Sequence, residues 1–202
     1  MEDVLDLYEQ PYDPKHPVIC FDERPCQLID DAIIPIPIKP RSPKKEHYEY
    51  IRNGTCCIFL AFEPRAGKRI VCVKERRTRV DYADFMKKLA LRYPEAETIL
   101  LVQDNLNTHT AGSFYEALPP EEAFKLARSF EFHFTPKKGS WLNMAEIELS
   151  ALSKQCLDRR IADLKTLTHE VSAGENERNS IGATVRWQFK KENARDKLQR
   201  HY

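Results

Sequence analysis

The stretch that decides the fold is residues 98–109, which read TILLVQDNLNTH. Residues 99–102 form a short, continuous apolar run between polar residues, which is typical of a strand buried on both faces of a sheet. The run leads into Asp104, and open α/β sheets present functional groups at the carboxyl ends of such strands. The stretch therefore predicts a buried strand that delivers a carboxylate to the edge of a sheet.

Two further carboxylates have comparable settings. The apolar run of residues 18–21 leads directly into Asp22 and Glu23, and Glu146 lies near the start of a predicted helix after the segment PKKGSWLN, residues 136–143. Glu148 competes with Glu146, because the two lie about 200° apart around the helix and flank its apolar stripe on opposite sides. Only one of them can face the aspartates, and periodicity leaves the choice open.

The remaining pattern predicts an α/β fold. Five strands are expected, at residues 18–21, 56–62, 69–73, 99–102 and 130–134. Helices are expected after a cap at Asp81, and at residues 109–117, 121–128, 144–157, 164–178 and 192–199. This order matches the ribonuclease-H-like fold, a mixed sheet flanked by helices, in which the first and fourth strands are parallel neighbours. Asp22 and Asp104 would then lie side by side.

Composition sets the limits of the chain. Its 202 residues, 42% hydrophobic and 31% charged, suffice for one domain with a real core. The net charge of +1 favours neither presence nor absence of a nucleic-acid partner, and no apolar run approaches the roughly 20 residues of a membrane span. Six cysteines without a C-x-x-C pair, and an acidic amino terminus unlike a secretion signal, indicate a reduced protein of the cytoplasm.

Basic residues gather in three segments that are candidates for contacts with DNA phosphates. Residues 33–45, IIPIPIKPRSPKK, are expected to be extended, and their four prolines exclude them from the centre of a sheet. They are either a solvated loop or an arm that follows DNA. The candidates are Lys39, Arg41, Lys44, Lys45, Arg76, Arg77, Arg79, Lys137 and Lys138.

The three acidic residues suit two-metal phosphoryl transfer. Mg²⁺ prefers oxygen ligands and needs only one or two carboxylates for each ion, so Asp22, Asp104 and Glu146 suffice for two Mg²⁺ ions, with Mn²⁺ as a substitute. The same residues also fit purely structural roles. The aspartates fit turns, and Glu146 fits a capping box with Asn143. Four neighbours are candidate supporting residues, namely Glu23, Asn105, His109 and Asn143.

Five ordered motifs resemble the DDE transposases of bacterial insertion sequences related to mariner elements. They are FDERP at 21–25, NGT at 53–55, DNLNTH at 104–109, SWLNMAE at 140–146 and CLDRR at 156–160. The resemblance implies a catalytic domain over residues 18–202 that cuts transposon ends and joins them to target DNA. It implies Asp22, Asp104 and Glu146 as the metal-binding triad, and so favours Glu146 over Glu148.

The resemblance also implies partners. These are double-stranded DNA, a dimer or higher assembly on DNA at the nucleoid, and helix-turn-helix units that bind transposon ends. Residues 1–17, interrupted by three prolines, are expected to be a linker from a missing N-terminal DNA-binding region, which a separate polypeptide could supply. The alternative is a truncated, silent remnant that inhibits by binding DNA or transposase. Gly174, where relatives commonly have an aromatic residue, predicts a loosened helix.

Overall fold

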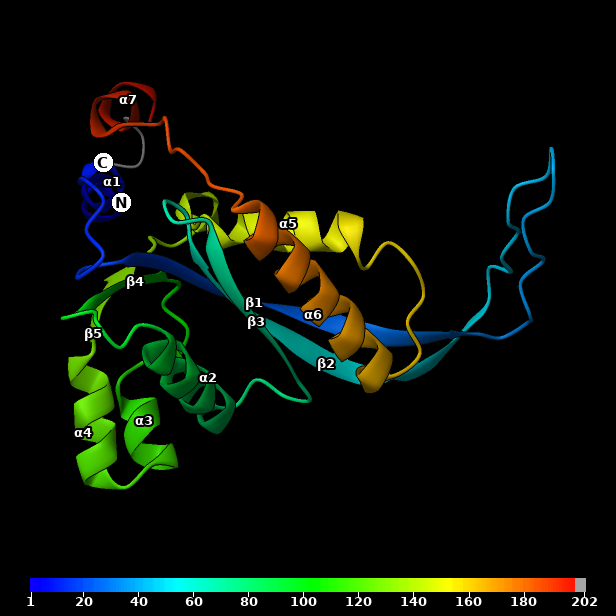
Figure 1. The fold of residues 1–202 in the computed structure, drawn as a ribbon, viewed down its shortest axis with the longest axis horizontal. Coiled ribbons are helices and arrows are strands. Elements are labelled where there is room, and N and C mark those ends of the chain that lie inside the picture. Colours follow the sequence, from blue (N-terminus) through cyan, green and yellow to red (C-terminus); the bar gives the residue numbers. More distant parts are fainter. Residues whose placement is uncertain (199–202) are drawn as a thin grey trace.

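A single five-stranded sheet organises the chain in the computed structural model, which describes residues 1–198. The strands are β1 Val18–Asp31, β2 Tyr50–Glu63, β3 Lys68–Lys74, β4 Ile99–Gln103 and β5 Phe130–Phe134, in the spatial order β3-β2-β1-β4-β5 (Figure 1). β1, β2 and β3 pair antiparallel, whereas β4 pairs parallel with both β1 and β5. The predicted mixed sheet, with the first and fourth strands as parallel neighbours, is confirmed.

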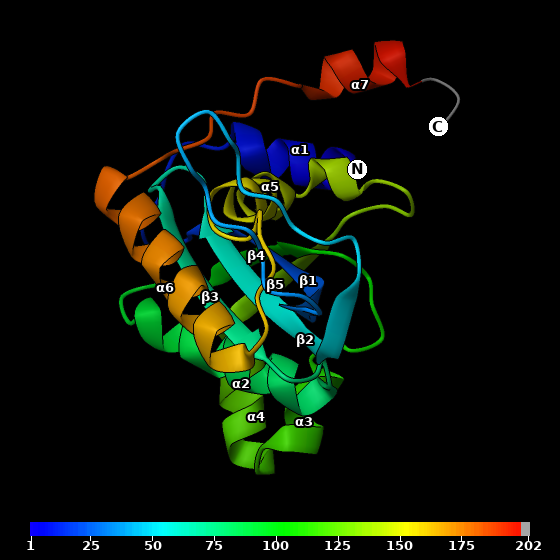
Figure 2. The ribbon, with the colours of Figure 1, turned by 90° about the vertical axis from the view of Figure 1, so that its right-hand side faces the viewer.

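Helices cover both faces of the sheet (Figures 1 and 2). One face carries α2 Arg79–Arg92, α3 Gly112–Ala117 and α4 Pro120–Arg128. The other carries α1 Glu2–Glu9, the short 3-10 helix η1 Ser140–Leu142, α5 Ala145–Gln155, α6 Leu164–Ile181 and α7 Lys191–Lys197. Each face has its own apolar core, which is what a sheet with two buried faces requires. No helix among residues 1–198 is long and apolar enough to cross a bilayer.

β1 is much longer than the predicted strand of residues 18–21. Beyond Phe21 it continues to Asp31, paired throughout with β2, and the two strands leave the body as a ribbon (Figure 1). Its polar sequence hid this extension, because a strand exposed to solvent lacks the apolar run that marks a buried one. The proline-rich segment lies at the end of the ribbon, within the arm, which we define as residues 32–49.

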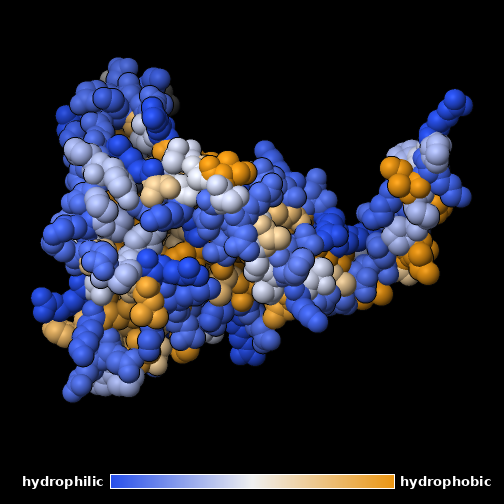
Figure 3. All heavy atoms as spheres, viewed as in Figure 1, coloured by the Kyte–Doolittle hydropathy of each residue, from blue (hydrophilic) through white to orange (hydrophobic). Residues whose placement is uncertain are grey.

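The arm is exposed and carries apolar side chains into solvent, visible as orange spheres at its end in Figure 3. Ile34 is 90% exposed and Ile38 76% exposed. Two isolated bridges, Ile36 with Lys45 and Lys39 with Ser42, close the arm into a narrow loop. The expectation that its prolines exclude it from the sheet centre is confirmed.

The expected linker, residues 1–17, packs against the domain over its first half. Val4 and Leu5 of α1 are fully buried, and the Tyr8 hydroxyl donates a hydrogen bond to the backbone oxygen of Leu142 at 2.7 Å. α1 is therefore a layer of the core and not a free tether. Only the stretch after it, residues 10–17, has the irregular backbone that its prolines predict.

Three local predictions need correction. Asp81 is not the helix cap: Thr78 is, and Asp81 occupies the third helical position of a reciprocal capping box. The helix expected from residue 109 begins at Gly112, because His109 lies in a preceding turn. The last helix runs from 191 to 197, and its predicted end, Gln199, lies outside the described residues.

Gly174 does not loosen α6 but allows close packing of α6 against the end of α5. A Cβ at this position would lie 2.6 Å from the Cys156 Sγ atom and 3.2 Å from a methyl carbon of Leu152. Real side chains do not approach so closely, so only glycine allows α6 to pack against the end of α5 at this distance.

Candidate functional site

The structure brings Asp22 and Asp104 together through strand register. Cys20 of β1 pairs with Val102 of β4. Asp22 lies two residues after Cys20, and Asp104 lies two residues after Val102. Successive side chains alternate between faces, so both aspartates project toward the face on which Cys20 and Val102 are buried. The same face carries α5, and therefore Glu146.

Asn143 ties the start of α5 to the aspartate strand. Its side-chain nitrogen donates to the backbone oxygen of Phe21 at 2.8 Å and lies 3.3 Å from the Asp22 Oδ2 atom. Its side-chain oxygen accepts a hydrogen bond from the backbone nitrogen of Ala145 at 3.2 Å. The expected capping box with Glu146 is therefore wrong, since Met144 is the helix cap and makes no side-chain cap bond. Asn143 instead holds the glutamate-bearing helix beside Asp22.

The choice between the two glutamates of α5 follows from burial. Glu148 is 1% exposed and accepts hydrogen bonds from Arg178 at 2.7 and 2.8 Å. The Arg69 Nε atom lies 3.0 Å from the same carboxylate, although without good hydrogen-bond alignment. Glu146 is exposed and lines a shallow cleft together with Glu23. Glu148 is thus engaged in the interior, whereas Glu146 lies close enough to Asp22 to raise the pKa of that carboxyl.

Asp22 lies in an unfavourable electrostatic environment. Burial raises its pKa from 3.8 to about 7, against the effect of a hydrogen bond from the backbone nitrogen of Glu23 at 2.8 Å. The nearby carboxylates of Glu146, Asp104 and Glu23 raise the pKa further. Carboxylates packed so closely repel one another unless a proton or a cation lies between them. The site therefore favours a bound cation.

His109 lies behind the aspartates and bridges two carboxylates. Its Nδ1 atom is 2.5 Å from the Asp104 Oδ1 atom, and its Nε2 atom is 2.5 Å from the Glu23 Oε2 atom, the latter without hydrogen-bond alignment. Burial opposes its protonation, but the two carboxylates outweigh burial and raise the pKa of His109 to about 9. Burial likewise raises the pKa of Asp104, yet the imidazolium keeps it below its usual value.

Further contacts fix this histidine. Its backbone oxygen accepts a hydrogen bond from the Gln103 side chain at 2.9 Å, and Gln103 accepts one from the Tyr82 hydroxyl at 2.8 Å. The Tyr82 ring also stacks on the imidazole, with centroids 4.9 Å apart. Sequence reasoning missed both residues; the one available signal was a glutamine that ends an otherwise apolar strand. Asn105, by contrast, is exposed beside Asp104.

The predicted basic residues fall in different places. Arg77 lies nearest the site, with its guanidinium 3.5 Å from the Glu23 carboxylate, and it helps to lower the pKa of Asp104. Arg79 forms an ion pair with Glu116. The others are exposed: Arg76 next to Arg77, Lys137 and Lys138 in the loop before η1, and Lys39, Arg41, Lys44 and Lys45 on the arm.

The donor set suits Mg²⁺ in its chemistry, because all three residues offer carboxylate oxygens in a place that favours positive charge. Among residues 1–198, no three acidic, histidine or cysteine side chains are arranged to hold one ion together. Two ions shared among three carboxylates do not require such a group, since each ion keeps water ligands.

Comparisons with known proteins identify the class. Residues 17–168 match the family model described as DDE superfamily endonuclease, and the chain belongs to this family. No curated protein matches the sequence. The Mos1 mariner paired end complex with Mn is similar in structure, with a TM-score of 0.52 at 14% identity over 89% of this chain and 57% of that one.

Two more structures resemble the chain. The Mos1 strand transfer complex has a TM-score of 0.50 at 14% identity, with 89% of this chain and 56% of that chain covered. The HTLV-2 integrase catalytic core in complex with magnesium has a TM-score of 0.47 at 12% identity, with 82% and 86% covered. The chain thus spans somewhat more than half of the Mos1 transposase chains, and it has the predicted ribonuclease-H-like fold.

Proposed function

We propose that this chain is a transposase catalytic domain that cuts DNA at transposon ends and joins the ends to target DNA. Asp22, Asp104 and Glu146 are the proposed catalytic residues and the ligands of two divalent ions, Mg²⁺ or Mn²⁺. The observation that carries the proposal is their convergence from two adjacent parallel strands and the helix above them. Membership of the endonuclease family supports the same reaction class.

The ions would activate the attacking hydroxyl and stabilise the leaving oxygen of the phosphodiester. The protein's part is positional and electrostatic. His109 holds the Asp104 carboxylate ionised and fixed, and Asn143 holds Asp22 against the start of α5. Because its pKa is raised, Asp22 gives up a proton when a cation binds, which links metal affinity to pH.

Double-stranded DNA is the proposed substrate. Arg77 lies close enough to the Glu23 carboxylate to meet a phosphate backbone entering the site, and Arg76, the preceding residue, is exposed. The similar Mos1 structures are of paired-end and strand transfer complexes, which supports transposon ends as substrates. The proposed working assembly is a dimer or a higher assembly on DNA. Recognition of specific ends would require helix-turn-helix units, in an additional N-terminal region or in a separate polypeptide of the nucleoid.

Plasmid nicking tests the proposal. With Mg²⁺ or Mn²⁺, the chain should convert supercoiled plasmid to the nicked form, and excess EDTA should stop the reaction. Asp104→Asn should abolish nicking, whereas Asp30→Asn, an exposed change on the same strand as Asp22, should leave it intact. Nicking that survives Asp104→Asn would refute the assigned site. DNA binding without metal-dependent nicking in the unaltered chain would favour the silent-remnant alternative.

A further inference from the structure

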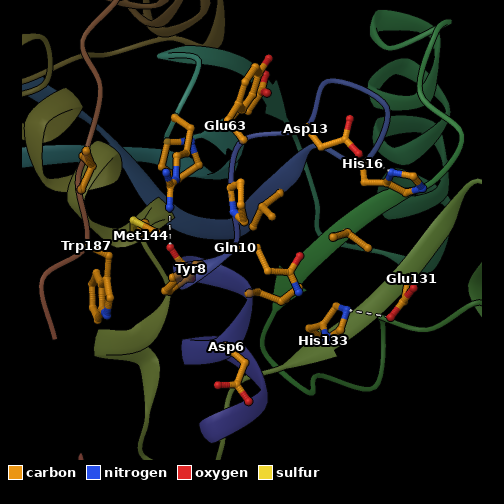
Figure 4. Close-up of a pocket in the computed structure, with 18 of the residues that line it drawn as sticks. Asp6, Tyr8, Gln10, Asp13, His16, Glu63, Glu131, His133, Met144 and Trp187 are labelled. Carbon is orange, nitrogen blue, oxygen red and sulfur yellow. Dashed lines mark hydrogen bonds and ion pairs between the residues drawn. The ribbon is translucent and has the colours of Figure 1, made fainter. Parts of the chain in front are cut away.

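A cavity of about 690 Å³ lies beside α1, and none of the three proposed catalytic carboxylates lines it (Figure 4). It is bounded by α1 and the segment that follows it, the starts of β1 and β4, β5, the β2–β3 turn and the segment around Trp187. Its volume is in the range of natural ligand pockets, roughly 300–1,000 Å³. The cavity is therefore large enough for an organic ligand.

Acidic side chains dominate the wall of the cavity. Five carboxylates line it, and in the described part of the chain Arg65 is the only lysine or arginine that does so. The Arg65 guanidinium donates a hydrogen bond to the backbone oxygen of Tyr8 at 2.8 Å. The five carboxylates are those of Asp3, Asp6, Asp13, Glu63 and Glu131. A cavity with this balance of charge repels DNA phosphates and attracts cations.

Glu63 is the most deeply buried of the five carboxylates. It is 2% exposed, and its carboxylate accepts a hydrogen bond from the Tyr93 hydroxyl, a neutral partner, at 3.0 Å. Burial raises the pKa of Glu63, and neither this hydrogen bond nor the charge of Lys68 cancels that effect. A carboxylate in such a setting is stabilised by a cation brought next to it.

His133 and Glu131, both on β5, independently point to a ligand that donates hydrogen bonds. The His133 Nδ1 atom lies 2.8 Å from the Asp3 carboxylate, and because an ionised carboxylate only accepts, Nδ1 carries a hydrogen. His133 is 8% exposed, and its Nε2 atom makes no hydrogen bond to the described residues, although the Glu131 carboxylate lies 3.2 Å away. In the neutral ring Nε2 is an acceptor, so two acceptors face each other there. An ammonium group shared between them would satisfy both.

The carboxylates are spread around the cavity and do not form a single metal site. Figure 4 shows the labelled acidic side chains on different segments of its wall. Among residues 1–198, no three acidic, histidine or cysteine side chains are arranged to hold one ion. The rings of Tyr8, Tyr12 and Trp187 also line the cavity, and aromatic faces attract organic ammonium groups. This distribution fits a flexible chain that carries several ammonium groups.

We propose that the cavity binds a linear aliphatic polyamine, whose ammonium groups pair with Glu63 and Glu131. This site is separate from the proposed catalytic carboxylates, and its occupation does not depend on DNA chemistry. Asp3 and Asp6 belong to α1, whereas Glu63 belongs to β2 and Glu131 to β5. A polyamine in the cavity would therefore hold α1 against the sheet.

Calorimetric titration of the full chain with spermidine, a linear triamine, at about pH 7.5 and about 0.15 M salt tests the proposal. The unaltered chain should bind spermidine saturably, and 1,4-diaminobutane should compete for the site better than 1-aminobutane, which has a single charge. Glu63→Gln combined with Glu131→Gln should weaken binding about tenfold, because two ion pairs with the ligand are lost. Asp30→Asn combined with Glu121→Gln, which removes two exposed charges outside the cavity, is the matched control. Tyr12→Leu should weaken binding about two- to fivefold through the loss of its ring.

Thermal unfolding gives the second readout. Spermidine should raise the melting temperature of the unaltered chain and of the control variant, and it should raise that of the cavity variant less. Glu131→Gln alone, an exposed change, should also reduce the effect of spermidine.

Three results would overturn the proposal. The first is equal spermidine affinity in the cavity variant and its control. The second is displacement of spermidine by MgCl₂ as readily as by 1,4-diaminobutane, because general screening would then explain the binding. The third is a loss of spermidine affinity in Asp104→Asn, which would place the amine at the catalytic carboxylates. Neither readout involves nicking, so the outcome is independent of the test of the proposed function.

Discussion

Glu146 and Glu148 lie two residues apart on α5, yet substitution by glutamine should have different effects at the two positions. It should lower stability at Glu148 and nicking activity at Glu146. Glu148→Gln should destabilise the protein, because it leaves Arg69, which is 3% exposed, beside a neutral amide in the interior. Breaking a buried ion pair from one side costs about 3–5 kcal/mol. Arg69 keeps hydrogen bonds to the backbone oxygens of Gly67 and Ala183, so we expect the lower end of that range. For a chain of this length, 3 kcal/mol lowers the melting temperature by about 6–12 °C.

Glu146→Gln is the matched control. Its side chain is exposed, so its melting temperature should stay within about 2 °C of that of the unaltered chain. Its nicking rate should fall more than about 100-fold, since even the partners of metal ligands are worth 10–100-fold. Thermal unfolding in EDTA and plasmid nicking with Mg²⁺ measure the two effects. A stable but inactive Glu148→Gln together with an active Glu146→Gln would refute the reasoning and make Glu148 the third carboxylate.

Three further outcomes follow from the same structure. Asp22→Asn should stabilise the metal-free protein: a folded pKa of about 7 against 3.8 makes the ionised carboxylate unfavourable by up to about 4 kcal/mol above pH 7. This cost of ionisation decreases as the pH falls toward 3.8. Urea unfolding in EDTA should therefore show a larger gain in the free energy of unfolding for Asp22→Asn at pH 8 than at pH 5. An equal gain at both pH values would contradict the prediction. Gly174→Ala should cost about 1–3 kcal/mol through contact with the Cys156 sulfur, and Cys156→Ala in the same chain should recover much of the loss in a double-mutant cycle. Gly67→Ala should be more harmful than an ordinary surface change, because its φ of +64° is left-handed and its Cβ would lie 2.6 Å from the Gly182 oxygen; unchanged thermal stability would rule out that contact.

The central sheet of this fold could be predicted from the sequence, because buried strands have short apolar runs and the order of the elements restricts the topology. The pairing of Asp22 with Asp104 followed from that order alone. The pattern could not choose between Glu146 and Glu148, because that choice depends on two arginines, one on β3 and one on α6, that reach only Glu148. Helical periodicity describes a single helix, whereas the environments of the two glutamates depend on the elements that pack against that helix.

Other features were hidden for related reasons. The outer half of β1 is largely exposed to solvent and carries polar residues. It forms a strand because it is hydrogen-bonded to β2, and apolar patterning does not mark it. The burial of α1 could not be read from residues 1–17, whose prolines suggested a tether. Asn143 looked like a helix cap, but its side chain reaches across to Phe21 and Asp22, which are 122 and 121 residues away in sequence.

The length of β1 determines how a force on the arm would reach Asp22. At ~3.3 Å per residue, the nine steps from Asp22 to Asp31 extend about 30 Å, so a force on the outer tip acts through a long lever. The pairing with β2 slips between Leu28 and Ile29, and the Ile29 nitrogen bonds there to the Ile161 oxygen of the α5–α6 connection at 2.8 Å. We therefore expect the ribbon to bend at this irregularity, because the ladder is interrupted there. Asp22, seven residues before it, would then keep its position when the arm is displaced.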